Sequence, residues 1–399
     1  MTKTQNYQKT IYACFIGYIV QAIVNNFLPL LFLMFHSEYG IPLSKITFLV
    51  TFNFGLQMFV DLISPRFVDK IGYKVSIIIA HIFATAGLVL LTVLPESTPE
   101  PFAGIMIAVL VYAVGGGLLE VLVSPIMEAC PTDNKETAMS MLHSFYCWGH
   151  VGVVLLSTLF FAVAGIEHWK IMAFVWALVP FANIIIFAGA PVNHLIAEGE
   201  EQISTKALLS NKFFWILMLM MVCAGASEQA VSQWASTFAE MGLVVSKTVG
   251  DLAGPMFFAI MMGSARAVYG KWGERMNLNR FMVCSTLLCV FSYLLVSLSP
   301  WPLLGLLGCG ICGLSVGIMW PGTFSMGAAG IKNGGTLMFA LFALAGDVGC
   351  SGGPTLVGLV SSAMGDDLKK GILAAIVFPL LLLVGIALFG KNTKALKME

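Results

Sequence analysis

The stretch "IMIAVLVYAVGGGLLEVLVSP" (residues 105–125) contains fifteen consecutive hydrophobic or glycine residues before its first charge, Glu120. A helix needs about 20 apolar residues to cross a bilayer core of roughly 30 Å, and the whole apolar run extends over residues 102–128. Barrel strands are shorter and alternate in polarity. The stretch therefore predicts a membrane-spanning helix that carries an acid.

The rest of the chain has the same character. Its 399 residues are 58% hydrophobic and 11% charged, with a mean hydropathy of +0.89, whereas a soluble domain is about 25% charged. Zero net charge argues against a nucleic-acid partner, and nine cysteines, mostly in apolar runs, indicate no disulfide framework. The first run, near Ile11, is read as a retained helix and not as a signal peptide.

Charges and turn residues separate twelve predicted spans, six on each side of a polar stretch from Asn193 to Asn211. The spans lie near residues 11–35, 44–64, 74–95, 102–128, 136–164, 169–189, 212–238, 249–268, 281–299, 302–328, 335–362 and 370–390. We predict an all-α membrane protein with an N-terminal six-helix bundle (1–192), a cytoplasmic linker (193–211) and a C-terminal six-helix bundle (212–399).

Basic residues in the loops predict the orientation. With the N-terminus in the cytoplasm, sixteen lysines and arginines, Arg266 among them, fall on the inside and five on the outside. Both termini are therefore expected on the cytoplasmic side of the cell's inner membrane. We expect a multi-pass protein, monomeric in the lipid bilayer.

The two halves repeat each other. The loop "PRFVDKIGYKV" (65–75) follows span 2, and "GKWGERMNLNR" (270–280) follows span 8, with Asp69 and Glu274 each followed by a base. In spans 5 and 11, "WGHVG" and "AGDVG" place His150 where Asp347 stands. Two similar halves imply a pseudo-two-fold axis along the membrane normal and a central site between them.

These loops resemble the signature G-x-L-A-D-R-x-G-R-R-K of the major facilitator superfamily. The first retains Asp69, Gly72 and Lys74, and the second retains Gly270 and Arg275. The resemblance covers the whole chain and implies that family's fold, with the loops as a cytoplasmic latch; the alternative is a positive-inside loop without a latch. The expected latch or gating residues are Asp61, Asp69, Lys70, Lys74, Glu274, Arg275 and Asp347.

Glu120 is costly inside a span, by about 2.5 kcal/mol or more on insertion scales. Its surroundings, a glycine run followed by Leu-Glu, resemble span 4 of the fucose permease group, and the resemblance implies a role in proton translocation. That group's partner aspartate in span 1 is replaced here by Asn26. His143 and His150 on span 5 are candidates to extend a proton path. Helix packing is the alternative for all three titratable groups.

Polar side chains on spans 1, 7 and 10 are candidates for solute binding. Amides hydrogen-bond hydroxyl groups without a charge, and indole rings stack on the apolar faces of sugars, so the set suits a small neutral polyhydroxy solute. Each amide is otherwise explained as interhelical packing. The candidates are Gln21, Asn25, Asn26, Glu228, Gln229, Gln233, Trp234 and Trp320.

Other chemistry is not indicated. "GCGICG" (308–313) lies inside an apolar span with no βαβ unit, so it is no nucleotide fingerprint. No Walker loop, metal-ligand spacing or catalytic set occurs, so we expect no cofactor, no metal and no enzyme activity.

We expect a secondary active transporter that moves a small neutral polar solute, with a sugar favoured, by alternating access coupled to protons. A drug/proton antiporter using Glu228 is the alternative. A third possibility, a non-transporting solute sensor, is expected to carry a long cytoplasmic extension, and the chain ends about ten residues after its last span.

Overall fold

A computed structural model describes residues 7–41, 43–195, 203–235, 252–365 and 367–396. The predicted end of the seventh span, the start of the eighth and the acidic run of the linker lie outside these described residues.

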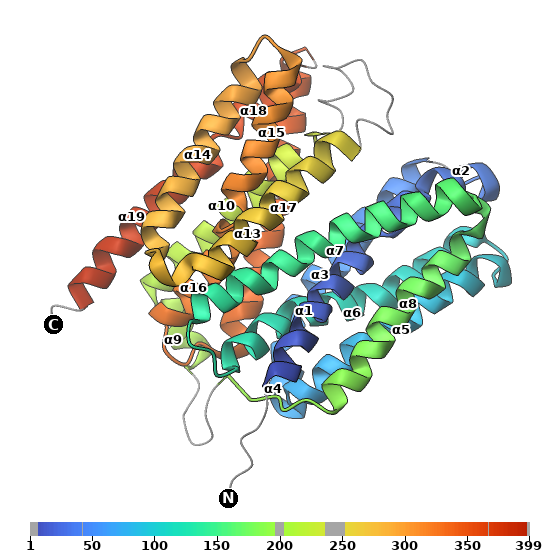
Figure 1. The fold of residues 1–399 in the computed structure, drawn as a ribbon, viewed down its shortest axis with the longest axis horizontal. Helices are drawn as coiled ribbons and strands as arrows, with labels where there is room; N and C mark the ends of the chain where they lie inside the picture. Colours follow the sequence, from blue (N-terminus) through green and yellow to red (C-terminus); the bar gives the residue numbers. More distant parts are fainter. Residues whose placement is uncertain (1–6, 42, 196–202, 236–251, 366, 397–399) are drawn as a thin grey trace, which may run out of the picture. The chain divides into compact units, whose positions relative to one another are not determined.

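The N-terminal half is helical throughout its predicted spans (Figure 1). The elements are α1 (Gln8–Asn26), η1 (Leu28–Leu31), α2 (Phe32–Tyr39), α3 (Leu43–Ile63), α4 (Pro65–Ile71), α5 (Tyr73–Ser97), α6 (Pro101–Ala129), α7 (Lys135–Ala164), η2 (Ile166–His168) and α8 (Trp169–Ala188). The opening stretch lies in α6, one continuous helix of 29 residues that is long and apolar enough to span a bilayer.

The C-terminal half follows the same plan after a short linker helix, α9 (Thr205–Ser210). Its elements are α10 (Lys212–Ser232), η3 (Leu252–Met256), α13 (Phe257–Trp272), η4 (Gly273–Arg275), α14 (Leu278–Leu298), α15 (Pro302–Val316), α16 (Met319–Gly330), α17 (Gly335–Ala363), α18 (Leu368–Ala374) and α19 (Val377–Leu396). Among the described residues, ten helical segments are long and apolar enough to span a bilayer. Together with α3 and α13 they make the twelve predicted spans, so the predicted fold class is confirmed.

Three spans are broken where the sequence prediction drew one continuous helix. The first span changes to the 3₁₀ helix η1 at Pro29, whose ring cannot continue the helical hydrogen-bond ladder. The tenth breaks at Gly317 and Ile318, between α15 and α16. The twelfth breaks at Ala375 and Ile376, between α18 and α19. Broken helices of this kind leave backbone groups that other side chains must satisfy.

Contacts between backbone positions divide the chain into two units. The first comprises residues 1–131, 145–200 and 335–340, and the second comprises residues 132–144, 201–334 and 341–399. Helices α7 and α17 therefore contribute to both units.

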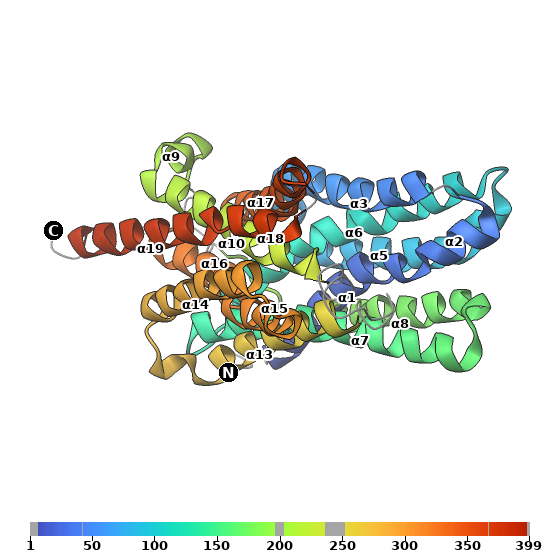
Figure 2. The same cartoon turned by 90° about the horizontal axis from the view of Figure 1, so that it is seen from above.

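In the first unit, α5 packs along both α6 and α8, and α3 packs along α6 (Figure 2). Glycine makes the α5–α6 approach possible. A Cβ on Gly87 would overlap the backbone of Tyr112, and a Cβ on Gly115 would lie 2.6 Å from the carbonyl oxygen of Ala80. Small residues bring helix backbones together in membranes, where the lipid itself provides no hydrophobic drive.

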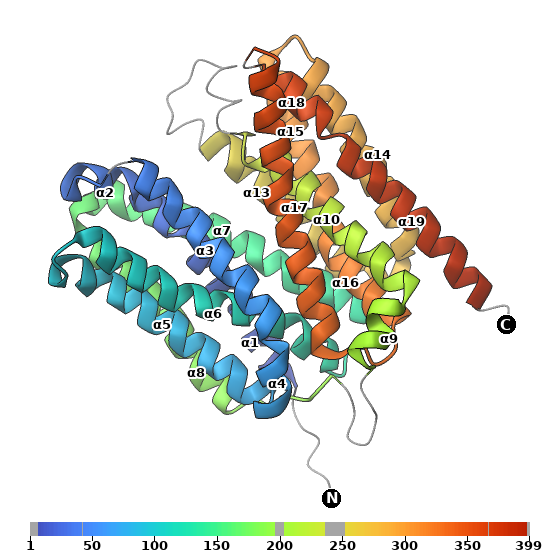
Figure 3. The same ribbon diagram turned by 180° about the vertical axis from the view of Figure 1, so that it is seen from behind.

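In the second unit, α14 packs against α15 and α19 (Figure 3). Glycines also mediate the contact of α10 with α17: a Cβ on Gly349 would overlap the carbonyl oxygen of Val222, and one on Gly353 would lie 2.5 Å from that of Ala226. These two helices therefore touch backbone to backbone.

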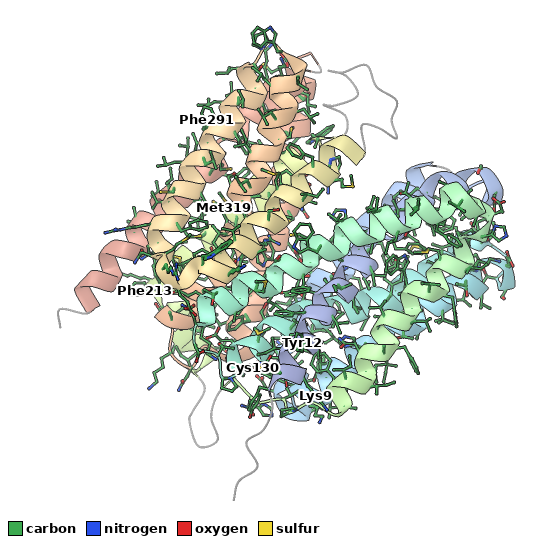
Figure 4. The ribbon with its side chains drawn as sticks, in the orientation of Figure 1. Lys9, Tyr12, Cys130, Phe213, Phe291 and Met319 are labelled. Carbon is green, nitrogen blue, oxygen red and sulfur yellow. The ribbon has the colours of Figure 1, made fainter. Side chains whose placement is uncertain are left out.

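The outward faces of both units are apolar. Phe291 on α14 is 54% exposed (Figure 4), and Val163 on α7 and Leu298 on α14 are 83% and 65% exposed. Large apolar surface of this extent is rare on soluble monomers and is what lipid tails cover in a membrane protein. By contrast, Gln21, Asn53 and Gln57 are buried inside the first unit, and Glu120 is half-buried there.

Candidate functional site

Glu120 projects from α6 toward α1 within the first unit. Its Oε2 accepts a hydrogen bond of 3.1 Å from Nε2 of Gln21, whose side chain is 2% exposed. None of the ion pairs formed by the described residues includes Glu120. The carboxylate is therefore held by a neutral amide, which does not fix its charge.

A second carboxylate lies beside it. Asp61 on α3 is fully buried, and one of its oxygens lies within 4.8 Å of an oxygen of Glu120. The sequence assigned Asp61 to the latch, whereas the structure brings it to Glu120. Two carboxylates this close repel each other when both are ionised.

Amide side chains continue from Glu120 along α1 and α3. Nε2 of Gln21 also donates to Oε1 of Gln57 at 3.0 Å, and Nε2 of Gln57 donates to Oδ1 of Asn25 at 2.8 Å. Nδ2 of Asn53 donates to the same Asn25 oxygen at 3.3 Å. The five side chains form one continuous chain of hydrogen bonds, called here the amide chain: Glu120, Gln21, Gln57, Asn25 and Asn53.

The far end of the amide chain reaches a small cleft beside the break in the first span. Asn25 and Asn53 supply its amide groups, and the remaining lining is apolar or aromatic. The lining residues are Val24, Asn25, Leu28, Pro29, Phe32, Leu49, Asn53, Phe54 and Tyr112. Asn26, predicted with this set, instead donates from Nδ2 to the carbonyl oxygen of Ala22 in its own helix at 2.9 Å.

The glycine run of the opening stretch positions α3 beside this chain. A Cβ on Gly116 would lie 3.2 Å from Cδ of Gln57 and 3.0 Å from a methyl carbon of Val24, and one on Gly117 would lie 2.9 Å from Val60. Larger residues here would displace Gln57. The glycines therefore allow the amides of α1 and α3 to reach the carboxylate of α6.

Among the predicted latch residues, Asp69 makes a contact in the first unit. Its Oδ1 accepts from Oγ1 of Thr336 at 2.6 Å, in the first turn of α17, and the Tyr73 hydroxyl lies 2.7 Å from the same Oγ1. Negative charge is favourable at a helix N-terminus. Lys74 donates to the carbonyl oxygen of Ala190 at 3.0 Å.

The other predicted latch and gating residues lie apart from this contact. Lys70 on α4 is exposed, as are Glu274 and Arg275 on η4. Asp347 is buried within α17, in the second unit.

The two histidines of α7 fall in different units. The ring of His143 stacks on Phe324 with centroids 5.8 Å apart, in the second unit. His150 is half-buried in the first unit. Their spacing in sequence therefore does not place them in one packed group, and a proton path through both stays a prediction.

The predicted polar cluster of span 7 is also hydrogen-bonded. Nε2 of Gln229 donates to Glu228 at 3.4 Å, and Nε2 of Gln233 donates to Gln229 at 3.1 Å. Trp234 donates from its indole to the carbonyl oxygen of Pro354 at 3.3 Å, which orients the ring. Trp320 in α16 packs against Gly346, where any Cβ would overlap the indole.

Arg266 in α13 balances the charge of this cluster. Its Nη2 lies 3.2 Å from Oε2 of Glu228, with the two side chains 4% and 12% exposed. Nε donates to the carbonyl oxygen of Gly317 in the α15–α16 break at 2.8 Å, and Nη1 donates to that of His143 at 3.1 Å. Counting Arg266 as a loop base was wrong: it is 3% exposed inside a helix, and the remaining loop bases number fifteen inside against five outside.

Sequence reasoning missed Gln57, Asn53 and Arg266. Asn53 and Gln57 are four residues apart in an apolar run, the same spacing that identified Gln21 and Asn25 in span 1, so that signal was present. Arg266 was missed because span 8 was predicted to end at residue 268, whereas α13 continues to Trp272. The arginine therefore stood two residues from the predicted end of the span and was counted with the loop.

Comparison with known proteins agrees with this architecture. No curated protein matches the chain by sequence. Among solved structures, the E. coli fucose:proton symporter FucP superposes with a TM-score of 0.81 at 13% identity, covering 96% of this chain and 99% of FucP. The proton:xylose symporter XylE, bound to 6-bromo-6-deoxy-D-glucose, superposes with a TM-score of 0.80 at 10% identity, covering 96% and 95%.

The human organic anion transporter MFSD10 (TETRAN) superposes with a TM-score of 0.75 at 14% identity, covering 96% of this chain and all of that one. At these identities the likeness concerns the fold. The sequence model of the Major Facilitator Superfamily matches residues 12–354, most of the chain. The chain therefore belongs to the Major Facilitator Superfamily, a family of membrane transporters.

Proposed function

We propose that this transporter moves a small neutral polar solute, with a sugar favoured, by alternating access coupled to protons. Glu120 carries the proton, and Asp61 is the second carboxylate of the pair. The protein acts in the cytoplasmic membrane with both termini inside, as the excess of basic residues in the inner loops favours.

The observation that carries the proposal is the setting of Glu120. An acid held by an ion pair loses that pair when it takes up a proton, which is costly in a buried site. Glu120 is held by the neutral amide of Gln21 and lies near a second carboxylate. Proton uptake there relieves repulsion and breaks no ion pair among the described residues.

The polar groups of the first unit support a neutral solute. Asn25 and Asn53 line the cleft with amides, and its other walls are apolar or aromatic. Amides bind hydroxyl groups as donors and acceptors without requiring a charge. Uncharged amides on these walls favour a neutral ligand with hydroxyl groups over a charged one.

The antiporter alternative needs an acid that attracts a cationic drug. Glu228 was the candidate, and its charge is balanced by Arg266 at 3.2 Å. A buried acid already paired in this way attracts a cation weakly. This pairing favours the sugar proposal over the drug/proton antiporter.

The solute is tested first by thermal stability. Purified protein is heated with fucose, xylose or glucose, and with ethidium as the cationic comparison. A bound solute stabilises the folded protein by mass action and so raises its melting temperature. At a solute concentration of a hundred times Kd, the free energy of unfolding rises by about 2.7 kcal/mol. Stabilisation by ethidium and by none of the sugars contradicts the proposed solute class.

Coupling is tested with Glu120→Gln in proteoliposomes. The amide cannot carry a proton, so an inward pH gradient should no longer drive accumulation of the stabilising sugar, while exchange of labelled for unlabelled sugar continues. Glu167→Gln on η2, whose side chain is 65% exposed, is the matched control and should accumulate sugar normally.

Normal uphill accumulation by the Glu120→Gln protein contradicts the proton role of Glu120. Binding without any translocation by the wild type, in either assay, instead identifies a solute sensor. The two results are distinguishable because exchange is measured alongside accumulation.

A further inference from the structure

The amide chain has a direction. Gln21 donates toward Glu120 and toward Gln57, Gln57 donates onward to Asn25, and Asn53 donates to the same Asn25 oxygen. In the bonds that lead from Gln21 to Asn25, the donor is thus always the residue nearer to Glu120, and Gln21 also donates to the carboxylate itself. An ionised carboxylate is an acceptor only.

Two acceptor atoms in the chain are not used. Oε1 of Gln21 and Oδ1 of Asn53 are buried and accept no hydrogen bond from any residue that the structure describes. Their side chains are 2% and 5% exposed. Buried acceptors without donors are costly, by about 1–3 kcal/mol each, so the chain is poised to gain from any change that brings donors to these atoms.

A proton on Glu120 is such a change. The protonated carboxyl group becomes a donor, and the Nε2 of Gln21 that now faces it is also a donor. A half-turn of the Gln21 amide would place its unused oxygen opposite the new hydroxyl. The same half-turn would put two oxygens face to face between Gln21 and Gln57, which the next amide relieves by turning as well.

We propose that Gln57 is a positioning residue that transmits the protonation state of Glu120 to Asn25 and Asn53 by reversing the direction of the hydrogen bonds between them. This inference rests on the proposed proton coupling and deepens it. After reversal, Gln57 donates to Gln21 and accepts from Asn25, and Asn53 accepts from Asn25 through its formerly unused oxygen.

No proton travels along the amide chain. One proton binds to Glu120 and stays there, and each amide keeps both of its own protons while it rotates. What changes at the cleft is which atom of Asn25 and Asn53 is available. The cleft therefore presents different hydrogen-bonding groups to a solute hydroxyl before and after proton uptake.

The charged groups around Glu120 are consistent with protonation of Glu120 as the event that reverses the amide chain. Among the described residues of the first unit, Asp61 faces it from α3, within 4.8 Å, and α1 contributes the neutral amide of Gln21. On α5, His81 lies 2.8 Å from the amide nitrogen of Asn183 and 2.7 Å from the carbonyl oxygen of Ile77, so its ring is engaged elsewhere.

The test needs no solute. Infrared spectra of the full-length protein follow the protonated-carboxyl band through a pH titration, and Glu120→Gln identifies the band of Glu120 by its loss. Asn25 does not contact Glu120 directly, so Asn25→Leu should shift the titration midpoint through Gln57 alone. We expect the proton affinity of Glu120 to change about threefold or more, the size of one hydrogen bond.

The same substitution is then made in a Gln57→Leu background. Asn25→Leu should have no further effect there, because the connection is already broken. An equal shift with and without Gln57, or no shift in either background, overturns the proposal. Gln57→Met serves in place of Gln57→Leu if the latter lacks a cooperative thermal transition.

Asn183→Leu is the structural control. Asn183 is a fully buried amide of the same unit that donates to the carbonyl oxygen of Ala13 at 3.0 Å and lies against His81. It should leave the Glu120 band in place; a shift as large as that of Asn25→Leu shows a general loss of packing and contradicts the relay. Absence of any titrating Glu120 band in the wild type contradicts the proposed proton coupling itself, which separates the two failures.

Discussion

At the scale of single residues, the site depends on small side chains as much as on polar ones. Gly116 leaves room for Gln57, and a Cβ there would lie 3.2 Å from two atoms of that side chain. This distance is tighter than ordinary packing, so the amide must move by a few tenths of an ångström.

We therefore expect Gly116→Ala to lower sugar accumulation about tenfold while the protein still folds. The reason is that function falls steeply when a binding group such as the Gln57 amide is displaced from its position. Gly55→Ala on α3 is the control, since a Cβ there meets no atom within 4 Å. Accumulation and melting temperature are measured for both. Equal accumulation by the two variants shows that the position of Gln57 does not matter.

The residue scale also shows what sequence can and cannot predict. Glu120 was found because an acid in an apolar run is conspicuous, and Gln21 and Asn25 because they share one helix face. Asp61 was assigned to the nearest loop, because sequence gives the neighbours of a residue along its own helix and not those across α3 and α6. Proximity between helices depends on their rotation about their own axes, which apolar runs in lipid do not fix.

At the scale of elements, glycine positions determine which helices touch. Gly225, Gly349 and Gly353 bring α10 and α17 into backbone contact, whereas Gly352, next to one of them, faces open space. The sequence shows all four as similar small residues. The structure separates those that carry a helix crossing from the one that does not.

Gly349→Ala should therefore separate α10 from α17 and destabilise the protein, by about 1–3 kcal/mol as an overpacked contact. Gly352→Ala should leave stability nearly unchanged. Thermal unfolding in detergent, compared between the two variants, checks the expectation. A melting temperature for Gly349→Ala as high as that of Gly352→Ala contradicts the crossing.

Element boundaries show the same limit of prediction. The twelve spans were found because about 20 apolar residues are needed for each crossing, and this requirement does not depend on packing. The breaks at Gly317 and Ala375 were missed because hydropathy is continuous through them. Breaks depend on partners for the freed carbonyl groups, and those partners lie on other helices.

At the scale of the whole molecule, the charge asymmetry of the loops predicts a single orientation. Reporter proteins inserted at Gly165 and in α9 should therefore report opposite sides of the membrane, with α9 in the cytoplasm. A periplasm-active phosphatase and a cytoplasm-active fluorescent protein at each site provide the measurement. If both insertions report the same side, the predicted topology is wrong. If Gly165 reports the cytoplasm and α9 the opposite side, the orientation of the whole protein is the reverse of the predicted one.

Arg266 has a consequence for how events in the second unit are linked. A single planar guanidinium binds the Glu228 carboxylate and also the backbone oxygen where α15 stops and α16 starts. Lysine has no such fork, so it cannot replace this arrangement. A ligand that displaces Glu228 from Arg266 should therefore also disturb the backbone at Gly317, two residues before the start of α16. Because α16 carries Trp320, the fluorescence of that indole should report whether Glu228 is bound to Arg266.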